Sequence, residues 1–205
     1  YCHYEVLMDA LVADTRTLLI IGPTFSGRRR LLHQLLGESS GRPILISTRE
    51  PATNVRSRYQ RVTDAEKCTP VVIDCITNSL GRAKDETETT KYAQDPGNLT
   101  SVGMKFSVLL EQHRNDDLTV GLTNLSPLLV YSSPSEVFQF LHVVVQQSTG
   151  NDWPVVASID PGIHETATVE QFVPLFDRVI ETRRTGDGDH EFRGRNSGDM
   201  DWKSF

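Results

Sequence analysis

The sequence predicts a single α/β domain with a mostly parallel central sheet, helices on both faces and a closing antiparallel hairpin. Three observations lead to this prediction. Strand-length apolar runs alternate with segments of helical apolar spacing, an order typical of parallel sheets. The inner runs are continuously apolar, as expected for strands buried on both faces. Near the end, residues 185–189 (TGDGD) separate RVIETRR from HEFRGR, which is a hairpin signal.

Each expected strand is an apolar run too short for a helix and bounded by polar or turn-forming residues. In chain order these runs are TLLIIG (17–22), PILIST (43–48), PVVIDCI (70–76), LTVGLTNL (118–125) and PVVASID (154–160). The two arms of the hairpin follow from residue 178 onward.

Each expected helix repeats apolar residues every three or four positions, so that one face can be buried. The helical patterns cover residues 3–13, 28–36, 53–60, 99–113, 135–147 and 168–176. Gly37 is expected to end the helix over 28–36. Residues 78–98 are polar, carry mixed charges and show no apolar period, so we expect a mobile loop there.

Length and composition fit one ordinary globular domain spanning residues 1–205. Of the 205 residues, 38% are hydrophobic and 23% are charged, and no apolar run approaches the roughly 18–20 residues of a membrane helix. Three scattered cysteines, Cys2, Cys68 and Cys75, predict neither a disulfide framework nor a zinc site, so a cytoplasmic location is expected. The net charge of −6 argues against a general affinity for nucleic acid.

The turn after the first strand has the frame of a phosphate-binding loop. Two glycines with four residues between them stand between a buried strand and a helix, where backbone N–H groups can converge on an anion. The expected nucleotide- or phosphate-binding residues are Gly22, Pro23, Thr24, Phe25, Ser26, Gly27, Arg28 and Arg29. An ordinary strand-to-helix turn is the alternative interpretation.

The two residues after the loop depart from the usual Gly-Lys-Ser/Thr ending. Arg28 stands in place of the lysine that reaches the phosphates, and its guanidinium could partly replace that contact. Arg29 stands in place of the hydroxyl that holds Mg²⁺, which arginine cannot do. Three arginines at the positive end of a helix are unfavourable by roughly 0.3–1 kcal/mol each. Either a bound anion offsets this repulsion, or the side chains are exposed and solvated.

Nearly the whole chain resembles the RecA/KaiC-like branch of P-loop ATPases, and most of all its degenerate members in halophilic archaea. Besides the loop, the resembling segments are ILISTREPA (44–52), VGLTNLSPLLVYSS (120–133) and VVASIDPGIHETATVEQFVPLFDRVIE (155–181). The resemblance implies a RecA-like three-layer fold with ATP or ADP as the ligand. It also implies that Thr123 occupies the place of the Mg²⁺-binding aspartate, and Arg49 the place of the first of two acidic residues.

Two weak catalytic candidates remain. Glu50 survives as the second acidic residue of that pair and could be a general base, although a solvent-facing strand end is the simpler interpretation. Asp74 follows a run of apolar residues and could be the metal-side acid if its strand lay next to the loop. The resemblance places that strand elsewhere in the sheet.

These departures predict a regulatory or interaction module. We expect weak or no binding of ATP or ADP, little or no hydrolysis, no bound Mg²⁺, and a protein partner or self-association; neither a membrane nor nucleic acid is expected as a partner. One alternative is an active ATPase completed by a neighbouring subunit. Another is a purely structural domain whose pocket is closed by side chains such as Phe25.

Overall fold

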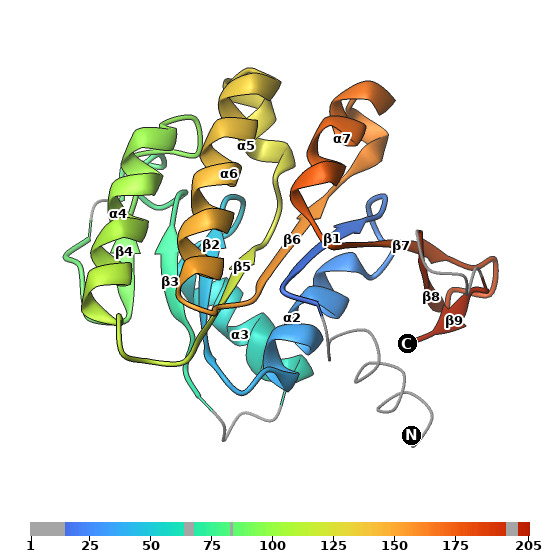
Figure 1. Ribbon diagram of the computed structural model, residues 1–205, viewed down its shortest axis with the longest axis horizontal. Helices are drawn as coiled ribbons and strands as arrows, with labels where there is room; N and C mark the ends of the chain where they lie inside the picture. Colours follow the sequence, from blue (N-terminus) through green and yellow to red (C-terminus); the bar gives the residue numbers. More distant parts are fainter. Residues whose placement is uncertain (1–14, 64–67, 83, 196–200) are drawn as a thin grey trace.

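In the part of the chain that the computed structural model describes, residues 15–63, 68–82, 84–195 and 201–205, nine strands form one sheet (Figure 1). Their order across the sheet is β4-β3-β2-β5-β6-β1-β7-β8-β9. The strands are β1 (Thr17–Ile21), β2 (Arg42–Ser47), β3 (Val71–Asp74), β4 (Thr90–Tyr92), β5 (Leu118–Leu122), β6 (Val155–Ile159), β7 (Arg178–Arg184), β8 (His190–Gly194) and β9 (Lys203–Ser204). Strands β1 to β7 pair in parallel, and β7, β8 and β9 pair antiparallel. The mostly parallel sheet and the C-terminal hairpin are therefore confirmed.

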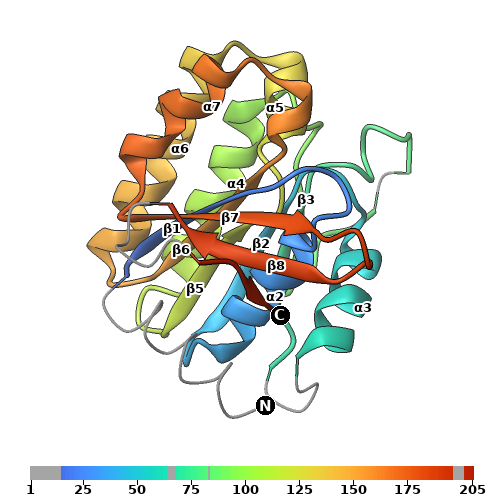
Figure 2. The ribbon, with the colours of Figure 1, turned by 90° about the vertical axis from the view of Figure 1, so that its right-hand side faces the viewer.

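Helices cover both faces of this sheet, as Figures 1 and 2 show from two sides. Helices α2 and α3 lie on one face, and α4, α6 and α7 lie on the other. The helices are α2 (Arg28–Glu38), α3 (Ala52–Val62), α4 (Leu99–Gln112), α5 (Ser126–Tyr131), α6 (Pro134–Gly150) and α7 (Thr166–Phe172), with short 3₁₀ turns at Pro161–Ile163 and Val173–Leu175. The helix expected over 3–13 lies outside the described residues. None of the described helices has the length and apolar character needed to cross a bilayer.

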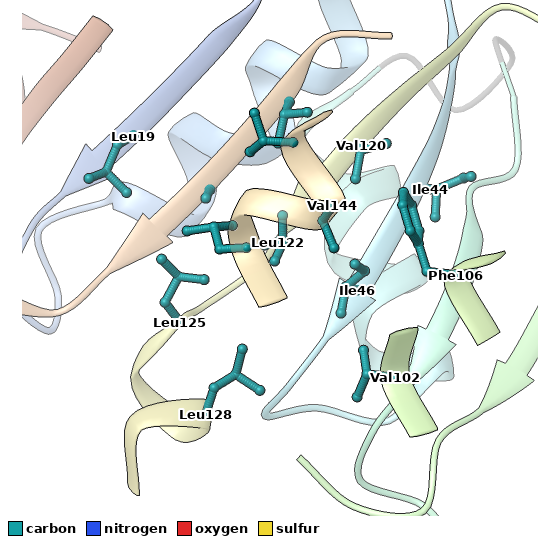
Figure 3. Close-up of a cluster of buried hydrophobic side chains, with 14 of the residues drawn as sticks. Leu19, Ile44, Ile46, Val102, Phe106, Val120, Leu122, Leu125, Leu128 and Val144 are labelled. Atoms are coloured by element: carbon teal, nitrogen blue, oxygen red, sulfur yellow. The ribbon is translucent and has the colours of Figure 1, made fainter. Parts of the chain in front are cut away.

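The strands are apolar throughout because both of their faces are buried. Along β1, Leu19 and Ile21 belong to the cluster under α4, α6 and α7, part of which Figure 3 shows. Leu18 and Ile20 belong to the cluster under α2 and α3. Side chains alternate across a strand, so a continuous apolar run supplies both clusters at once. Each fully buried side chain of this kind stabilises the fold by roughly 1.5–3 kcal/mol.

Helix α2 does not end at Gly37, contrary to the sequence prediction. It continues to Glu38, and the N–H of Ser39 donates to the carbonyl of Leu35. Gly37 has a packing role, because a Cβ at this position would lie 2.4 Å from Cγ2 of Thr63 at the end of α3. The glycine lets the two helices approach and does not terminate the first of them.

The segment 78–98 contains a strand, so the prediction of a loop was wrong for residues 90–92. Strand β4 pairs in parallel with β3 at the edge of the sheet. Thr90 and Lys91 are buried, and Arg56 of α3 donates to the hydroxyl of Thr90 at 2.8 Å. A three-residue edge strand held by polar contacts has no apolar period for a sequence pattern to detect. The mobility of the rest of the segment stays a prediction.

The strand order decides which turns lie near the loop at residues 22–27. The carboxyl ends of parallel strands meet at one edge of a sheet, where ligand sites of α/β folds are found. Because β1 lies between β6 and β7, the loop has the end of β6 on one side and β7 on the other. Strands β2, β5 and β6 separate β3 from β1.

Candidate functional site

The backbone of the loop leaves several N–H groups free. Gly27 has a left-handed conformation with φ of 81° and precedes α2 as its N-cap, and Phe25 has φ of 67°. Among the described residues, none accepts a hydrogen bond from the N–H groups of Phe25, Gly27, Arg28 or Arg29. Free amides at the positive end of a helix favour an anion. The loop therefore presents several backbone donors that are not used within the described part of the chain.

The hydroxyl groups of the loop are used to hold its shape. Thr24 Oγ1 donates to Asp160 Oδ2 at 2.7 Å. Ser26 Oγ lies 2.7 Å from Thr182 Oγ1 of β7, and both side chains are buried. These contacts hold the loop to the end of β6 on one side and to β7 on the other.

The side chain of Arg28 is buried and contacts the backbone of the loop. Its Nη1 donates to the carbonyl of Gly22 at 2.7 Å and to Asp160 Oδ2 at 3.2 Å, and the residue is only 5% exposed. Burial lowers the pKa of Arg28, and the charge of Asp160 opposes this effect. Its Nη1 is thus engaged by the loop and the end of β6, and the expectation that Arg28 partly replaces the phosphate-binding lysine stays a prediction.

Asp160 is one of the site residues that sequence reasoning missed, together with Arg58, Arg184 and His190. Burial alone would raise the pKa of Asp160, but hydrogen bonds from Thr24 and the Gly162 N–H, together with the charge of Arg28, hold it below its ordinary value. Asp160 is therefore ionised, and its negative charge is balanced by Arg28. Its position directly after an apolar strand was the available signal, but the sequence does not say which strand lies beside β1.

Glu50 forms ion pairs with two arginines, Arg29 and Arg58. Arg29 Nη1 lies 2.7 Å from Glu50 Oε1, and Arg58 donates to both carboxylate oxygens, at 2.8 and 3.2 Å. Burial raises the pKa of Glu50, but the hydrogen bonds and charges of Arg58 and Arg29 outweigh it, and the pKa lies below its ordinary value. A carboxylate with a lowered pKa and both oxygens occupied is poorly suited to be a general base. Nor is Glu50 a simple solvent-facing strand end, since its side chain is 19% exposed.

These residues border a cleft of about 590 Å³ at the carboxyl edge of the sheet. Its lining includes six arginines and one acidic residue, Glu50. The arginines are Arg28, Arg29, Arg30, Arg49, Arg58 and Arg184. The cleft is thus strongly positive on a chain whose net charge is −6. Phe25 lines the cleft but is 77% exposed, so it does not close the pocket as the structural alternative required.

Three of these arginines have no counter-ion within the described part of the chain. Arg30 comes from the first turn of α2, Arg49 follows β2, and Arg184 ends β7. All three are exposed, and none forms an ion pair with a described residue. At the start of α2, Arg28 is therefore buried, Arg29 is paired with Glu50, and Arg30 has no ion-pair partner among the described residues. The sequence analysis had expected all three side chains either to face a bound anion or to be exposed and solvated.

Asp74 and Thr123 do not line the cleft. Asp74 accepts hydrogen bonds from the N–H of Ala52 at 2.8 Å, the N–H of Ile76 at 2.8 Å, and both the N–H and hydroxyl of Thr77. It binds the start of α3 to the end of β3, which is a structural role. Thr123 is buried after β5 and donates to the carbonyl of Ile46 at 3.2 Å.

The residues of the site do not fit Mg²⁺. The metal prefers oxygen ligands in near-octahedral geometry, whereas Arg29 offers only donors and Thr123 is turned toward a carbonyl. Glu50 already accepts from two arginines. In the described ranges, no three His, Cys, Asp or Glu side chains gather closely enough to hold a metal ion.

Comparison with known proteins gives a family and a fold. A family model described as "Family of unknown function (DUF7504)" matches residues 15–182. No curated protein matches the chain. A similar solved structure is that of uncharacterized protein PH0321 from Pyrococcus horikoshii, in complex with an unknown peptide. It is 11% identical with a TM-score of 0.64, over 98% of this chain and 97% of the other. At this identity the likeness shows the fold alone.

Proposed function

The chain belongs to the DUF7504 family of unknown function, and we propose that it is a degenerate RecA/KaiC-like P-loop domain that binds phosphate-bearing ligands weakly, without a metal. In this proposal it hydrolyses little or no ATP and acts as a regulatory or interaction module. The observation that supports it most is the combination of free loop amides and a cleft lined by six arginines. Backbone amides and guanidinium groups are the usual partners of phosphate oxygens.

The proposed lack of hydrolysis is supported by how the remaining groups of the site are used. Phosphoryl transfer depends on positioning and on neutralising charge around the transferred group, with the metal and a base as central parts. Here the donor set does not suit Mg²⁺, and Glu50 is held as a carboxylate by Arg29 and Arg58. A neighbouring subunit could add a residue, but it would not release Arg28 or Glu50 from their partners within the chain.

A regulatory or interaction role is supported by the contacts between the loop and the C-terminal strands. His190 of β8 lies with Nε2 3.1 Å from the carbonyl of Phe25, and Phe205 packs against His190 and Phe192. A ligand in the cleft would therefore contact β7 and β8, which lie next to the edge strand β9. The peptide bound by the Pyrococcus horikoshii protein belongs to that protein, and it supports a protein partner here only by analogy of fold.

Titration calorimetry of the full chain with ATP, ADP and inorganic phosphate tests the proposal. We expect ATP to bind with a dissociation constant on the order of 0.1–1 mM. Added Mg²⁺ should not strengthen binding, because the described residues of the cleft do not provide a set of oxygen ligands for the metal. ATP hydrolysis should stay at the background rate. A tight complex that requires Mg²⁺, or steady turnover of ATP, would contradict the proposal.

Replacing Glu50 with glutamine should strengthen binding of ATP by about threefold to tenfold. The change removes the negative charge that competes with the ligand for Arg29 and Arg58. Glu191→Gln is the matched control, because Glu191 also pairs with an arginine, has the same 19% side-chain exposure, and does not line the cleft. Weaker binding after Glu50→Gln would mean that Glu50 positions the two arginines for the ligand instead of competing with it.

A further inference from the structure

The cleft contains more positive charge than the protein itself neutralises. Glu50 is shared by Arg29 and Arg58, and Arg28 is balanced by Asp160. That leaves Arg30, Arg49 and Arg184, which come from three different elements and face the same cleft without an ion-pair partner among the described residues. Like charges gathered in one cleft repel each other, so the arrangement favours a ligand with several negative charges.

The lining offers little to a nucleobase. Small-molecule sites are usually lined mainly by apolar and aromatic side chains. In this cleft, only Pro23 and Phe25 present side chains that are wholly apolar, and Phe25 is mostly exposed. The ring of His190 is directed toward the carbonyl of Phe25. The groups available for recognition are therefore guanidinium groups and backbone amides.

The size of the cleft exceeds the needs of a single phosphate. A volume of about 590 Å³ lies within the range of roughly 300–1,000 Å³ that is typical of small-molecule sites. A chain of linked phosphate groups would place one group at the loop amides and the others against the unpaired arginines.

From these observations we propose that the cleft binds a metal-free chain of linked phosphates, for which inorganic triphosphate is the simplest representative. Arg30, Arg49 and Arg184 would neutralise the charge that a metal ion neutralises elsewhere. The inference rests on the proposed function, because it concerns the same cleft. It adds that the nucleoside is dispensable and that Mg²⁺ opposes binding. A chelated Mg²⁺ ion lowers the charge of the ligand and brings a hydration shell that the arginines cannot coordinate.

Calorimetry of the full chain with sodium triphosphate, with and without Mg²⁺, tests the inference. We expect triphosphate to bind at least as tightly as ATP, to compete with it, and to lose affinity when Mg²⁺ is added. Each of the changes Arg30→Gln, Arg49→Gln and Arg184→Gln should weaken triphosphate binding by roughly tenfold or more, the usual loss for a charge-assisted contact. These residues are exposed, so thermal melting should show that the variants fold.

Arg61→Gln is the matched control. Arg61 is also an exposed arginine on a helix without an ion pair in the described ranges, but it does not line the cleft. It should leave triphosphate affinity unchanged. An equal loss with Arg61→Gln would show unspecific attraction and overturn the inference.

The outcomes separate the two proposals. If ATP binds but triphosphate neither binds nor competes, the inference is overturned and the proposed function stands. Binding that Mg²⁺ strengthens also overturns the inference. If neither ATP, ADP nor triphosphate binds, both proposals fail. A single-stranded oligonucleotide that displaces triphosphate at lower concentration would assign the cleft to nucleic acid instead.

Discussion

Replacing Asp160 with asparagine should lower the free energy of unfolding by about 3–5 kcal/mol. The side chains of Asp160 and Arg28 are only 5% and 6% exposed, so the change leaves a buried guanidinium without a counter-ion. Thr24 donates to Oδ2 and the N–H of Gly162 to Oδ1, so the one oxygen of asparagine can keep only one of these two hydrogen bonds. The loss therefore combines the missing charge with one lost hydrogen bond. Urea denaturation at neutral pH measures it.

The double variant Arg28→Met with Asp160→Asn is the control for this prediction. It removes both charges and should be more stable than Asp160→Asn alone. The pKa of Asp160 is lowered in the folded protein, so its stabilising contribution is present above its unfolded value of roughly 3.9. That contribution is lost as the pH falls through the folded pKa. The stability difference between the native protein and Asp160→Asn should shrink below about pH 4. A loss under 1 kcal/mol at neutral pH would mean that water reaches Arg28.

Replacing Gly27 with alanine should lower the free energy of unfolding by about 2–4 kcal/mol and weaken binding of triphosphate. At φ of 81°, any side chain costs roughly 1–2 kcal/mol. A Cβ here would also lie 2.8 Å from His190 Cγ and from Phe205 Cζ, so the C-terminal strands would have to move away from the loop. Urea denaturation and calorimetry measure the two effects.

Gly81→Ala separates the two causes. Gly81 also has positive φ, 69°, but a Cβ there would have no neighbour within 4 Å. This control should show the backbone cost alone, of roughly 1–2 kcal/mol, and unchanged triphosphate binding. Equal losses at the two glycines would show that the contact of Gly27 with His190 and Phe205 has no energetic weight.

Much of the fold could be predicted because its signals are local. The apolar run at 17–22 and the glycine frame after it required no knowledge of distant residues, and β1 and α2 lie there. The TGDGD turn gave the hairpin of β7 and β8 for the same reason. Strand β4 was missed because an edge strand of three residues is held by its neighbours and not by an apolar pattern.

The chemistry of the site depends on which strands are adjacent, and this is not a local property. Arg28 and Asp160 are 132 positions apart and meet only because β6 lies beside β1. Likewise, Arg184 reaches the cleft because β7 lies on the other side of β1. The sequence therefore predicted a loop with altered residues, but not that Arg28 would turn inward or that other arginines would surround the cleft.

Strand β7 connects the cleft to the outer edge of the sheet. Thr182 contacts Ser26 of the loop, and Arg184 lines the cleft two residues further along the same face. The next strand, β8, holds the carbonyl of Phe25 through His190. A partner that binds the β8–β9 edge changes the affinity of the cleft for its ligand when both the partner and the ligand favour particular positions of this hairpin. Thermodynamic linkage then requires the ligand to change the affinity for that partner by the same factor, so each would report the presence of the other.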